Sequence, residues 1–162
     1  MDDTYKTVEG PAEGYINEKK SKFISFIYPV QDADQVKAIV DELRDKYHDA
    51  RHVCWAYMLG WEREEFRSND DGEPSGTAGR PILGQINSAE LTDVLIAVVR
   101  YFGGTLLGTG GLIKAYKEAA ADAIANAEVV EKTVDDFINI HFEYPLLNEV
   151  MRVLKQFESV QW

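Results

Sequence analysis

The chain has 162 residues, of which 45% are hydrophobic and 11% aromatic, so it is long and apolar enough for one domain and part of a second. Its net charge of −11 opposes binding of the whole surface to nucleic acid or anionic membranes, although a local basic patch stays compatible with either. A single cysteine, an acidic and polar start (MDDTYKTVEG) and the lack of an apolar run of membrane-spanning length predict a cytoplasmic protein without a membrane partner.

The first part of the chain predicts an arm, a hairpin and a helix. Residues 1–11 are expected to form a loose arm. Two short strands follow within residues 14–30, joined by a turn at EKKSK. The lysines of that turn either are solvated or overhang a neighbouring site; they are Lys19, Lys20 and Lys22. Residues 32–47 repeat apolar side chains at helical spacing, and Asp32 is placed to cap that helix at its N-terminus.

A strand with aromatic and β-branched character, HVCWAYML, is expected after the helix, with Arg51 and His52 at its mouth. A lone histidine there is typical of a hydrogen-bonded structural residue. Cys54 lies inside the apolar strand and is typical of a small core residue rather than a nucleophile. Residues 61–67 alternate charged and aromatic side chains, which fits an exposed strand or one arm of a hairpin.

The centre of the chain predicts a short helix, a buried strand and a longer helix. Pro81 suits the first turn of the short helix, with Thr77 or a neighbour near its cap. Residues 93–101 contain VLIAVV, a continuous apolar run typical of a strand covered on both faces. The longer helix is expected at residues 110–127, where many alanines favour close packing against a sheet. Its predicted buried face comprises Leu112, Ile113, Tyr116, Ala120, Ala123, Ile124 and Ala127.

The character of the sequence changes after Glu128. An amphipathic strand is expected at residues 132–144, a helix opens at Pro145, and Trp162 stands at the start of another strand. One strand and one helix cannot close a core, so this tail is either an incomplete second domain or an appendage packed on the first.

Two glycine-rich segments carry the main functional signal: DGEPSGTAGRP (residues 71–81) and FGGTLLGTGG (residues 102–111). Each precedes a predicted helix, and Arg100 ends the strand that leads into the second. Helix starts carry unpaired N–H groups and the positive end of a dipole, so the segments predict a concave anion site of backbone amides and basic side chains. The alternative is that the glycines only allow tight turns and close packing. The second segment fits neither a P-loop nor a dinucleotide fingerprint.

Three carboxylates, Asp70, Asp71 and Glu73, accompany the first segment. Their spacing matches neither an EF-hand nor a zinc pattern, and no histidines stand at metal-ligand spacing, so neither a metal nor a cofactor is predicted. No arrangement of nucleophile and base is evident, which leaves open whether the protein is an enzyme. Glu73 is expected either to cap a helix start or to pair with Arg51, Arg80 or Arg100.

Several long motifs in consistent order resemble the YigZ/IMPACT family: EKKSKFISF, ARHVCWAYMLG, SNDDGEPSGTAGRPIL and VVRYFGGTLLGTGGLIKAY. The resemblance covers residues 14–127, and several motifs in register are more specific than any single glycine pattern. The motif positions of the family fall here on Glu73, Pro74, Gly76, Thr77, Ala78, Gly79, Pro81, Arg100, Gly103, Gly104, Gly108, Gly110, Gly111 and Lys114.

The resemblance implies an α+β fold. The main domain, residues 1–130, would share the fold of the second domain of the fifth small-subunit ribosomal protein, with a mixed sheet and helices packed on one face. The tail, residues 131–162, resembles the start of the ferredoxin-like C-terminal domain of the family, cut short.

The resemblance also implies a role. Eukaryotic members regulate translation by competing for the activator of the starvation-responsive initiation-factor kinase, and a nucleic-acid or ribosome role is suggested for bacterial members. We therefore expect a binding or regulatory protein linked to translation, which contacts RNA, the ribosome or a translation-regulating protein through its glycine-loop face. The alternative is an enzyme or sensor for a small phosphorylated or carboxylated ligand, bound at the paired helix N-termini.

The residues predicted to bind the ligand or partner come from the two glycine segments and the strand and helix beside them. They are Glu73, Gly76, Thr77, Gly79, Arg80, Arg100, Gly103, Gly104, Thr105, Gly108, Gly110, Gly111 and Lys114. A local cluster of cations is expected beside them, made of Lys19, Lys20, Lys22, Arg51, Arg80, Arg100 and Lys114.

Overall fold

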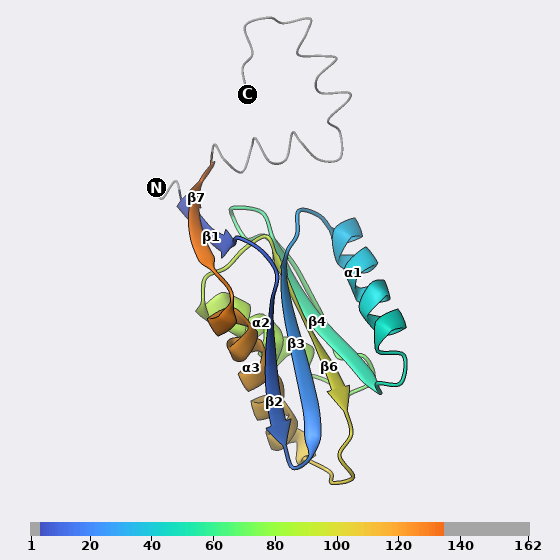
Figure 1. Cartoon of the computed structure of the whole chain (residues 1–162). Helices are drawn as coiled ribbons and strands as arrows, with labels where there is room; N and C mark the ends of the chain where they lie inside the picture. The colour runs from blue at the N-terminus through green and yellow to red at the C-terminus, as the bar shows by residue number, and fades with distance from the viewer. Residues whose placement is uncertain (1–3, 135–162) are drawn as a thin grey trace, which may run out of the picture.

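The computed structural model describes residues 4–134, which form two sheets and three helices in the α+β class that the sequence predicts (Figure 1). None of the described helices is long and apolar enough to cross a membrane. The elements in chain order are β1 (Thr4–Val8), β2 (Ala12–Glu18), β3 (Ser21–Pro29), α1 (Ala33–Lys46), β4 (His52–Leu59), β5 (Glu65–Asn69), α2 (Gly79–Ser88), β6 (Val94–Tyr101), α3 (Gly108–Asn126) and β7 (Val129–Thr133).

The main sheet has five strands in the order β2-β3-β6-β4-β5, and every neighbouring pair in it is antiparallel. The expectation of a mixed sheet is therefore wrong. Strands β3 and β4 do run in the same direction, as the crossover through α1 requires, but β6 inserts between them and pairs antiparallel with both. The apolar run of β6 is buried along its whole length except for half-buried Tyr101, which confirms the prediction of a strand covered on both faces.

Helices cover both faces of this sheet, so the expectation that they pack on one face is also wrong (Figure 1). Helices α2 and α3 pack against the face that carries Phe23, Ile96 and Val98. Helix α1 packs against the opposite face, which carries Leu95 and Ala97. Because side chains alternate along a strand, the continuous apolar run of β6 exposes apolar groups on both sides and needs both layers.

The helix starting after Asp32 follows its prediction. The Asp32 carboxylate accepts a hydrogen bond from the Gln35 N–H at 2.8 Å, and Val36, Val40 and Leu43 form the buried stripe. Such a cap is worth about 1 kcal/mol. The hairpin turn is confirmed as well, since Lys19 and Lys20 both have positive φ (47° and 70°), which suits the two-residue turns that join antiparallel strands.

Helix α3 lies close to the sheet through small side chains, as its alanines predict. Its buried residues are Leu112, Ala115, Tyr116, Ala119, Ala120 and Ala123. The predicted burial of Ile113 is wrong, because 42% of this residue is exposed. One residue advances a helix by about 100°, and the stripe that runs through Leu112 and Tyr116 turns Ile113 toward solvent.

The expected loose arm is wrong from residue 4 onward. Strand β1 pairs antiparallel with β7, and the N–H of Thr92 donates to the carbonyl oxygen of Lys6 at 2.8 Å. Tyr5 and Val8 are buried. Strand β7 lies more than a hundred residues after β1 in the chain, so no local sequence pattern predicts this pairing.

The predicted domain boundary at residue 130 falls inside β7. The strand expected at residues 132–144 is described only as far as the end of β7. The rest of it, the helix from Pro145 and the strand start at Trp162 lie outside the described residues, so the second domain stays a prediction.

The start of α2 is held by a carboxylate from outside the helix. The N-cap residue, Ala78, offers no side-chain cap, and Thr77 Oγ1 donates to the Pro74 carbonyl oxygen instead. Asp70 accepts hydrogen bonds from the N–H groups of Gly76, Ala78 and Gly79 at 2.8, 3.2 and 2.7 Å. Although desolvation raises it, the pKa of Asp70 lies below its ordinary value because these N–H donors favour the charged carboxylate.

Replacing Asp70 with Asn should lower the free energy of unfolding by about 1–2 kcal/mol at pH 7, because the α2 start loses its charged acceptor. The contribution of a carboxylate with a lowered pKa is complete above its unfolded pKa and is lost as pH falls through its folded pKa. The difference between Asp70→Asn and wild type should therefore shrink below about pH 4. Urea unfolding at several pH values measures the difference in free energy of unfolding between the variant and wild type. Asp45→Asn, at an exposed position, is the control. A difference that does not change with pH would show that the charge of Asp70 is not its cause.

Gly14 allows α3 to approach the β2–β3 hairpin. A Cβ at Gly14 would lie 2.5 Å from the backbone nitrogen of Ala123 and 2.5 Å from Ser25 Oγ, so Gly14→Ala must push the helix away. We expect a loss of about 1–3 kcal/mol in thermal or urea unfolding. Gly10→Ala is the matched control, because nothing lies within 4 Å of its added Cβ. Equal stability of the two variants would show that α3 is not packed this tightly.

Candidate functional site

The two glycine segments meet in space, as the sequence predicts, at the lower end of the molecule in Figure 1. The β5–α2 loop and the β6–α3 loop border an open cavity of about 300 Å³. Its lining combines a polar floor with a mostly apolar rim. The lining residues are Arg51, His52, Glu73, Pro74, Arg100, Phe102, Leu106, Leu107, Gly108, Thr109 and Leu112.

The floor of the cavity holds a buried ion pair between Glu73 and Arg100. Arg100 Nη1 donates to Glu73 Oε1 at 2.9 Å and to Oε2 at 2.7 Å, and the two residues are only 8% and 6% exposed. Tyr116 of α3 donates its hydroxyl to Glu73 Oε2 at 2.5 Å. Among the partners expected for Glu73, the structure therefore selects Arg100. The charge of this arginine, which was predicted to face a ligand, is already matched inside the protein.

Strand register places Phe23, Arg100 and His52 side by side across β3, β6 and β4. The Arg100 guanidinium lies 5.6 Å from the centre of the Phe23 ring, a cation–π distance. His52 Nδ1 lies 2.7 Å from the carbonyl oxygen of Asp71, to which it donates, and Nε2 lies 3.4 Å from Glu73 Oε1. This confirms His52 as a hydrogen-bonded structural residue that ties β4 to the β5–α2 loop.

Cys54 lies beneath this floor and is fully buried. Its Sγ is 3.1 Å from the Asp70 carbonyl oxygen and 3.4 Å from the Tyr116 hydroxyl. Burial, more than any neighbour, raises the pKa of both Cys54 and Tyr116 far above their ordinary values. Both groups stay protonated, which agrees with the interpretation of Cys54 as a core residue and gives no thiolate for nucleophilic chemistry.

The carboxylates of the first segment all serve the loop itself. Asp70 accepts from the α2 start, and Asp71 accepts from the Val53 N–H at 2.7 Å and from Arg44 at 3.1 Å. Glu73 is paired with Arg100. Within residues 4–134, no group of three or more His, Cys, Asp or Glu is arranged to hold a metal ion.

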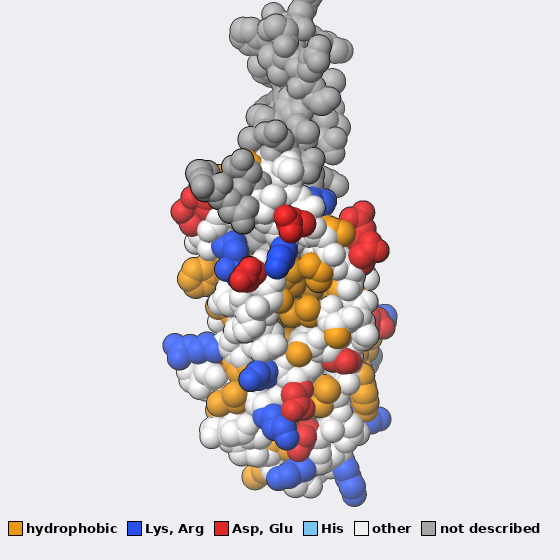
Figure 2. Space-filling model, turned by 90° about the vertical axis from the view of Figure 1, so that its left-hand side faces the viewer, with side chains coloured by type: hydrophobic (Ala, Val, Ile, Leu, Met, Phe, Trp, Pro, Cys, Tyr) orange, Lys and Arg blue, Asp and Glu red, His pale blue; other side chains and the backbone are white. Residues whose placement is uncertain are grey.

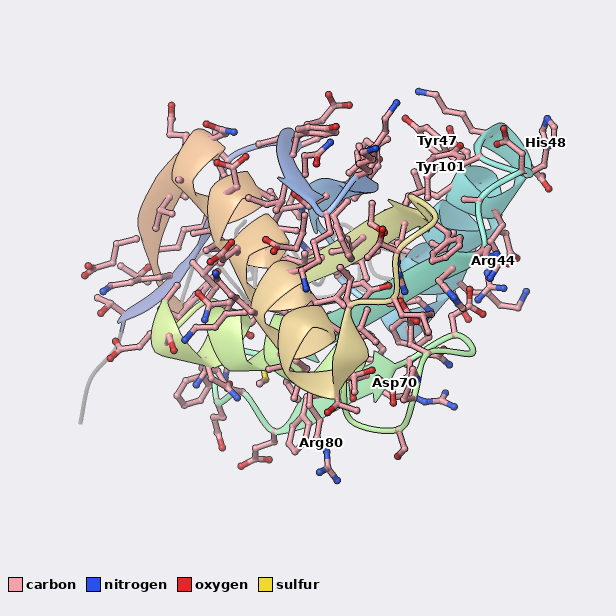
Figure 3. All side chains as sticks on the ribbon, turned by 90° about the horizontal axis from the view of Figure 1, so that it is seen from below. Arg44, Tyr47, His48, Asp70, Arg80 and Tyr101 are labelled. Atoms are coloured by element: carbon pink, nitrogen blue, oxygen red, sulfur yellow. The ribbon has the colours of Figure 1, made fainter. Side chains whose placement is uncertain are left out.

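The first glycine segment does not offer its amides to a ligand. The N–H groups of Gly76 and Gly79 donate to Asp70, so the α2 start expected to bind an anion is occupied by a carboxylate of the chain itself. Thr77 is buried and donates to Pro74. Arg80 is exposed, and its guanidinium Nη1 lies 3.9 Å from the position of a Cβ on Gly76, close enough for its charge to favour the ionised Asp70 carboxylate (Figure 3).

The second glycine segment is partly shaped by packing. A Cβ on Gly103 would collide with the backbone of Lys20 and Ser21, and the Gly103 N–H donates to Ser21 Oγ at 3.1 Å. Gly104 and Gly108 have positive φ (89° and 73°), the left-handed region that favours glycine. These contacts place the β2–β3 turn against the β6–α3 loop. The turn lysines are exposed, which agrees with the solvated alternative, and the cavity lining contains none of them.

The α3 start remains open to the cavity. Its N-cap, Leu107, provides no side-chain cap, and Thr109 and Gly110 are exposed. Nothing lies within 4 Å of a Cβ at Gly110, whereas one at Gly111 would lie 3.2 Å from Leu107 Cβ. On the floor, the buried Nε of Arg100 has no hydrogen-bond partner. This is the one of the two predicted helix starts that keeps the geometry of an anion site.

The remaining predicted positions lie on the surface. Thr105 is exposed in the β6–α3 loop, and Lys114 is exposed on α3 with its Nζ 4.0 Å from Glu118 Oε1. Figure 2 shows Lys and Arg side chains at the lower end of one face of the molecule, with Asp and Glu among them. Of the cations expected in a local cluster, Arg51 and Arg100 line the cavity.

Sequence reasoning missed the apolar rim of the cavity. Leu106 is 83% exposed and Phe102 is 38% exposed, and the Arg51 guanidinium lies 5.0 Å from the Phe102 ring centre. The signal was present in the sequence, because two leucines sit between glycines in a loop, where nothing in the loop itself can bury them. Ser21 and Tyr116 were also missed as site residues, since only the folded structure brings Ser21 to Arg100 and Tyr116 of α3 to Glu73.

Comparison with known proteins identifies the family of this chain. The Impact N-terminal domain model matches residues 19–124. The chain is 33% identical over 153 residues to the IMPACT family member YvyE of Bacillus subtilis (strain 168), covering 94% of this chain and 70% of that protein. It is 37% identical over 140 residues to the IMPACT family member YigZ of Escherichia coli (strain K12), covering 85% and 69%.

A crystal structure of a hypothetical protein superposes with a TM-score of 0.78 at 36% identity, over 82% of this chain and 66% of that one. The chain thus spans about two thirds of the length of the proteins it matches. The expected likeness to the fifth small-subunit ribosomal protein stays a prediction. The domain match and the two bacterial relatives together show that this chain belongs to the IMPACT family.

Proposed function

We propose that this chain is a cytoplasmic binding module in the regulation of translation, and that it grips a segment of a protein partner in the cavity between the β5–α2 and β6–α3 loops. The observation that carries the proposal is the exposed apolar rim. Leu106 and Phe102 stand at the mouth of a cavity of about 300 Å³, which is large enough for one or two side chains of a partner. The link to translation rests on the family resemblance.

The charges around the cavity favour a particular kind of segment. Glu73 neutralises Arg100, so Arg51 is the exposed cation of the cavity lining, and the backbone of Lys20 lies against Gly103 of the β6–α3 loop. A segment with an apolar side chain flanked by acidic residues would match this surface. RNA would gain from the positive charge of Arg51, but Phe102 is a single exposed phenyl ring in the cavity lining, and the overall charge of −11 opposes RNA binding.

Leu106→Asp should abolish partner binding without unfolding the chain, because the side chain is 83% exposed. The measurement is affinity capture from a lysate of the source cells, with bound proteins quantified by mass spectrometry. We expect translation factors or ribosome-associated proteins on the wild type and a loss of roughly tenfold or more with Leu106→Asp.

The matched control is Val129→Asp, which alters another exposed apolar residue (44%) on β7, at the opposite end of the molecule (Figure 1). This control should capture the same proteins as wild type. If Leu106→Asp captures the same proteins as wild type, the cavity is not the contact surface. Capture that ribonuclease removes would assign the face to RNA instead.

A second candidate, binding of a small phosphorylated or carboxylated ligand, is favoured by one observation. The uncapped α3 start and the unpaired Nε of buried Arg100 belong to the same cavity. Only this helix start would serve, because Asp70 occupies the start of α2. The apolar rim would then cover the carbon skeleton of the ligand.

Gly110 provides a matched pair of variants for this second candidate, since a side chain there meets nothing within 4 Å. A phosphate or dicarboxylate present at about 100 times its dissociation constant should raise the Tm by roughly 5–10 °C in wild type and in Gly110→Ala. Gly110→Asp should lose the shift because its carboxylate would repel the anion. Absence of any shift across inorganic phosphate, nucleotides and dicarboxylates would reject this candidate.

A further inference from the structure

The two edges of the main sheet differ in whether side chains cap their outward backbone groups. On the β2 edge, side chains of α3 satisfy the outward backbone groups: Asp122 accepts from the Tyr15 N–H at 2.8 Å, and Asn126 donates to the Glu13 carbonyl oxygen at 2.7 Å. On the β5 edge, the part of the chain that the structure describes provides no such cap, and the backbone of β5 pairs only with β4. An uncovered edge of this kind is a template for another strand.

The side chains of β5 alternate between charged residues on one face of the sheet and an aromatic residue on the other, which restricts how another strand can pair with this edge. Register with β4 places Glu65 and Arg67 on the α1 face, opposite Leu59 and Tyr57. Both are exposed, and neither forms an ion pair within residues 4–134. Phe66 points to the opposite face and is 57% exposed. The edge therefore carries one acid, one base and one bare ring in consecutive positions.

We propose that this edge pairs with the same edge of a second copy of the chain, so that two β5 strands run antiparallel and the sheet continues across the dimer. Directly opposite residues in a sheet point to the same face, so a symmetric pairing must be centred on a residue rather than between two residues. The central residue of β5 is Arg67, with Phe66 and Ser68 on either side. Centring on Ser68 sets Arg67 opposite the partner's Asn69 and forms no ion pair, so the choice lies between Arg67 and Phe66.

The charges select between these two registers. Centring on Arg67 sets this guanidinium opposite the partner's Arg67, a like-charge pair that opposes association. Centring on Phe66 sets Glu65 opposite the partner's Arg67 and Arg67 opposite the partner's Glu65. The same register brings the two Phe66 rings together on the other face, which removes exposed apolar surface from water. The occupant that complements this edge in charge and in shape is thus the edge itself.

This inference does not rest on the cavity of the proposed function, because the β5 edge and the cavity are formed by different side chains. The small size of a five-residue strand predicts a weak, reversible dimer at micromolar concentration rather than an obligate one. Sedimentation equilibrium of the full chain over a range of concentrations in 0.15 M salt measures it.

Charge reversal tests the register directly. Glu65→Arg alone would oppose two arginines in each cross-strand pair, and Arg67→Glu alone would oppose two glutamates, so each variant should weaken self-association by roughly tenfold or more. A mixture of the two variants restores an Arg–Glu pair at both positions. The mixture should therefore form a heterodimer with an affinity close to that of the wild-type dimer.

The matched controls change charge by the same amount elsewhere on the surface. Glu42→Arg and Lys46→Glu alter exposed residues of α1 and should leave the wild-type equilibrium unchanged. A wild-type chain that stays monomeric up to several hundred micromolar overturns the proposal. So does a dimer that is insensitive to both reversals, or a mixture that associates no better than its components, since each outcome would place any contact on another surface.

Discussion

The buried pair of Glu73 and Arg100 fixes how the loops of this protein stand against its sheet. Removing two charges from water costs several kcal/mol per ion, so such a pair persists only where most of the remaining hydrogen-bonding capacity is met; here the buried Nε of Arg100 is the exception. Here Arg100 contacts both carboxylate oxygens, Tyr116 donates a further hydrogen bond, and the Phe23 ring lies against the guanidinium. Because the contributors come from β3, β6, α3 and the β5–α2 loop, the pair forms only when these elements are all in place. Its contribution is best understood as fixing one arrangement rather than as adding net stability.

The same pair determines what the cavity can recognise. A free arginine at the end of β6 would make the floor strongly cationic, and the sequence alone favoured that interpretation. Because Glu73 matches the charge of Arg100, the floor of the cavity is nearly neutral. Selection between ligands therefore depends on the apolar rim, on Arg51 and on the open start of α3. Likewise, Asp70 satisfies the amides of α2 before any ligand arrives. The Arg100 guanidinium and the N–H groups at the start of α2, which the sequence suggested as anion-binding groups, thus form hydrogen bonds within the protein itself.

Local patterns in the sequence were sufficient for elements whose stability is local. The Asp32 cap of α1 and the lysine turn rest on contacts within a few residues, and both are confirmed. The burial of β6 depends on distant elements, but its continuous apolar run was enough to predict it. Pairings between distant segments were beyond such reasoning. The β1–β7 pairing joins the two ends of the described chain, and the insertion of β6 between β3 and β4 decides that the sheet is antiparallel. The site divides in the same way: the meeting of the glycine segments was predictable from their motifs, but the choice of Arg100 over Arg51 and Arg80 depended on strand register.

The two proposed surfaces are joined by one short piece of chain, residues 69–73, which leads from the free edge of β5 to the floor of the cavity. Coupling between them would require this piece to have two stable arrangements. The hydrogen bonds argue against that: Asp70 accepts from three backbone amides, Asp71 from Val53 and Arg44, and Glu73 from Arg100 and Tyr116. A segment held at every acidic residue has one arrangement, and a contact made at one end has no alternative state to select at the other. Pairing at the β5 edge would therefore bring two cavities into one particle and raise their avidity for a repeated partner, while the intrinsic affinity of each cavity stays unchanged.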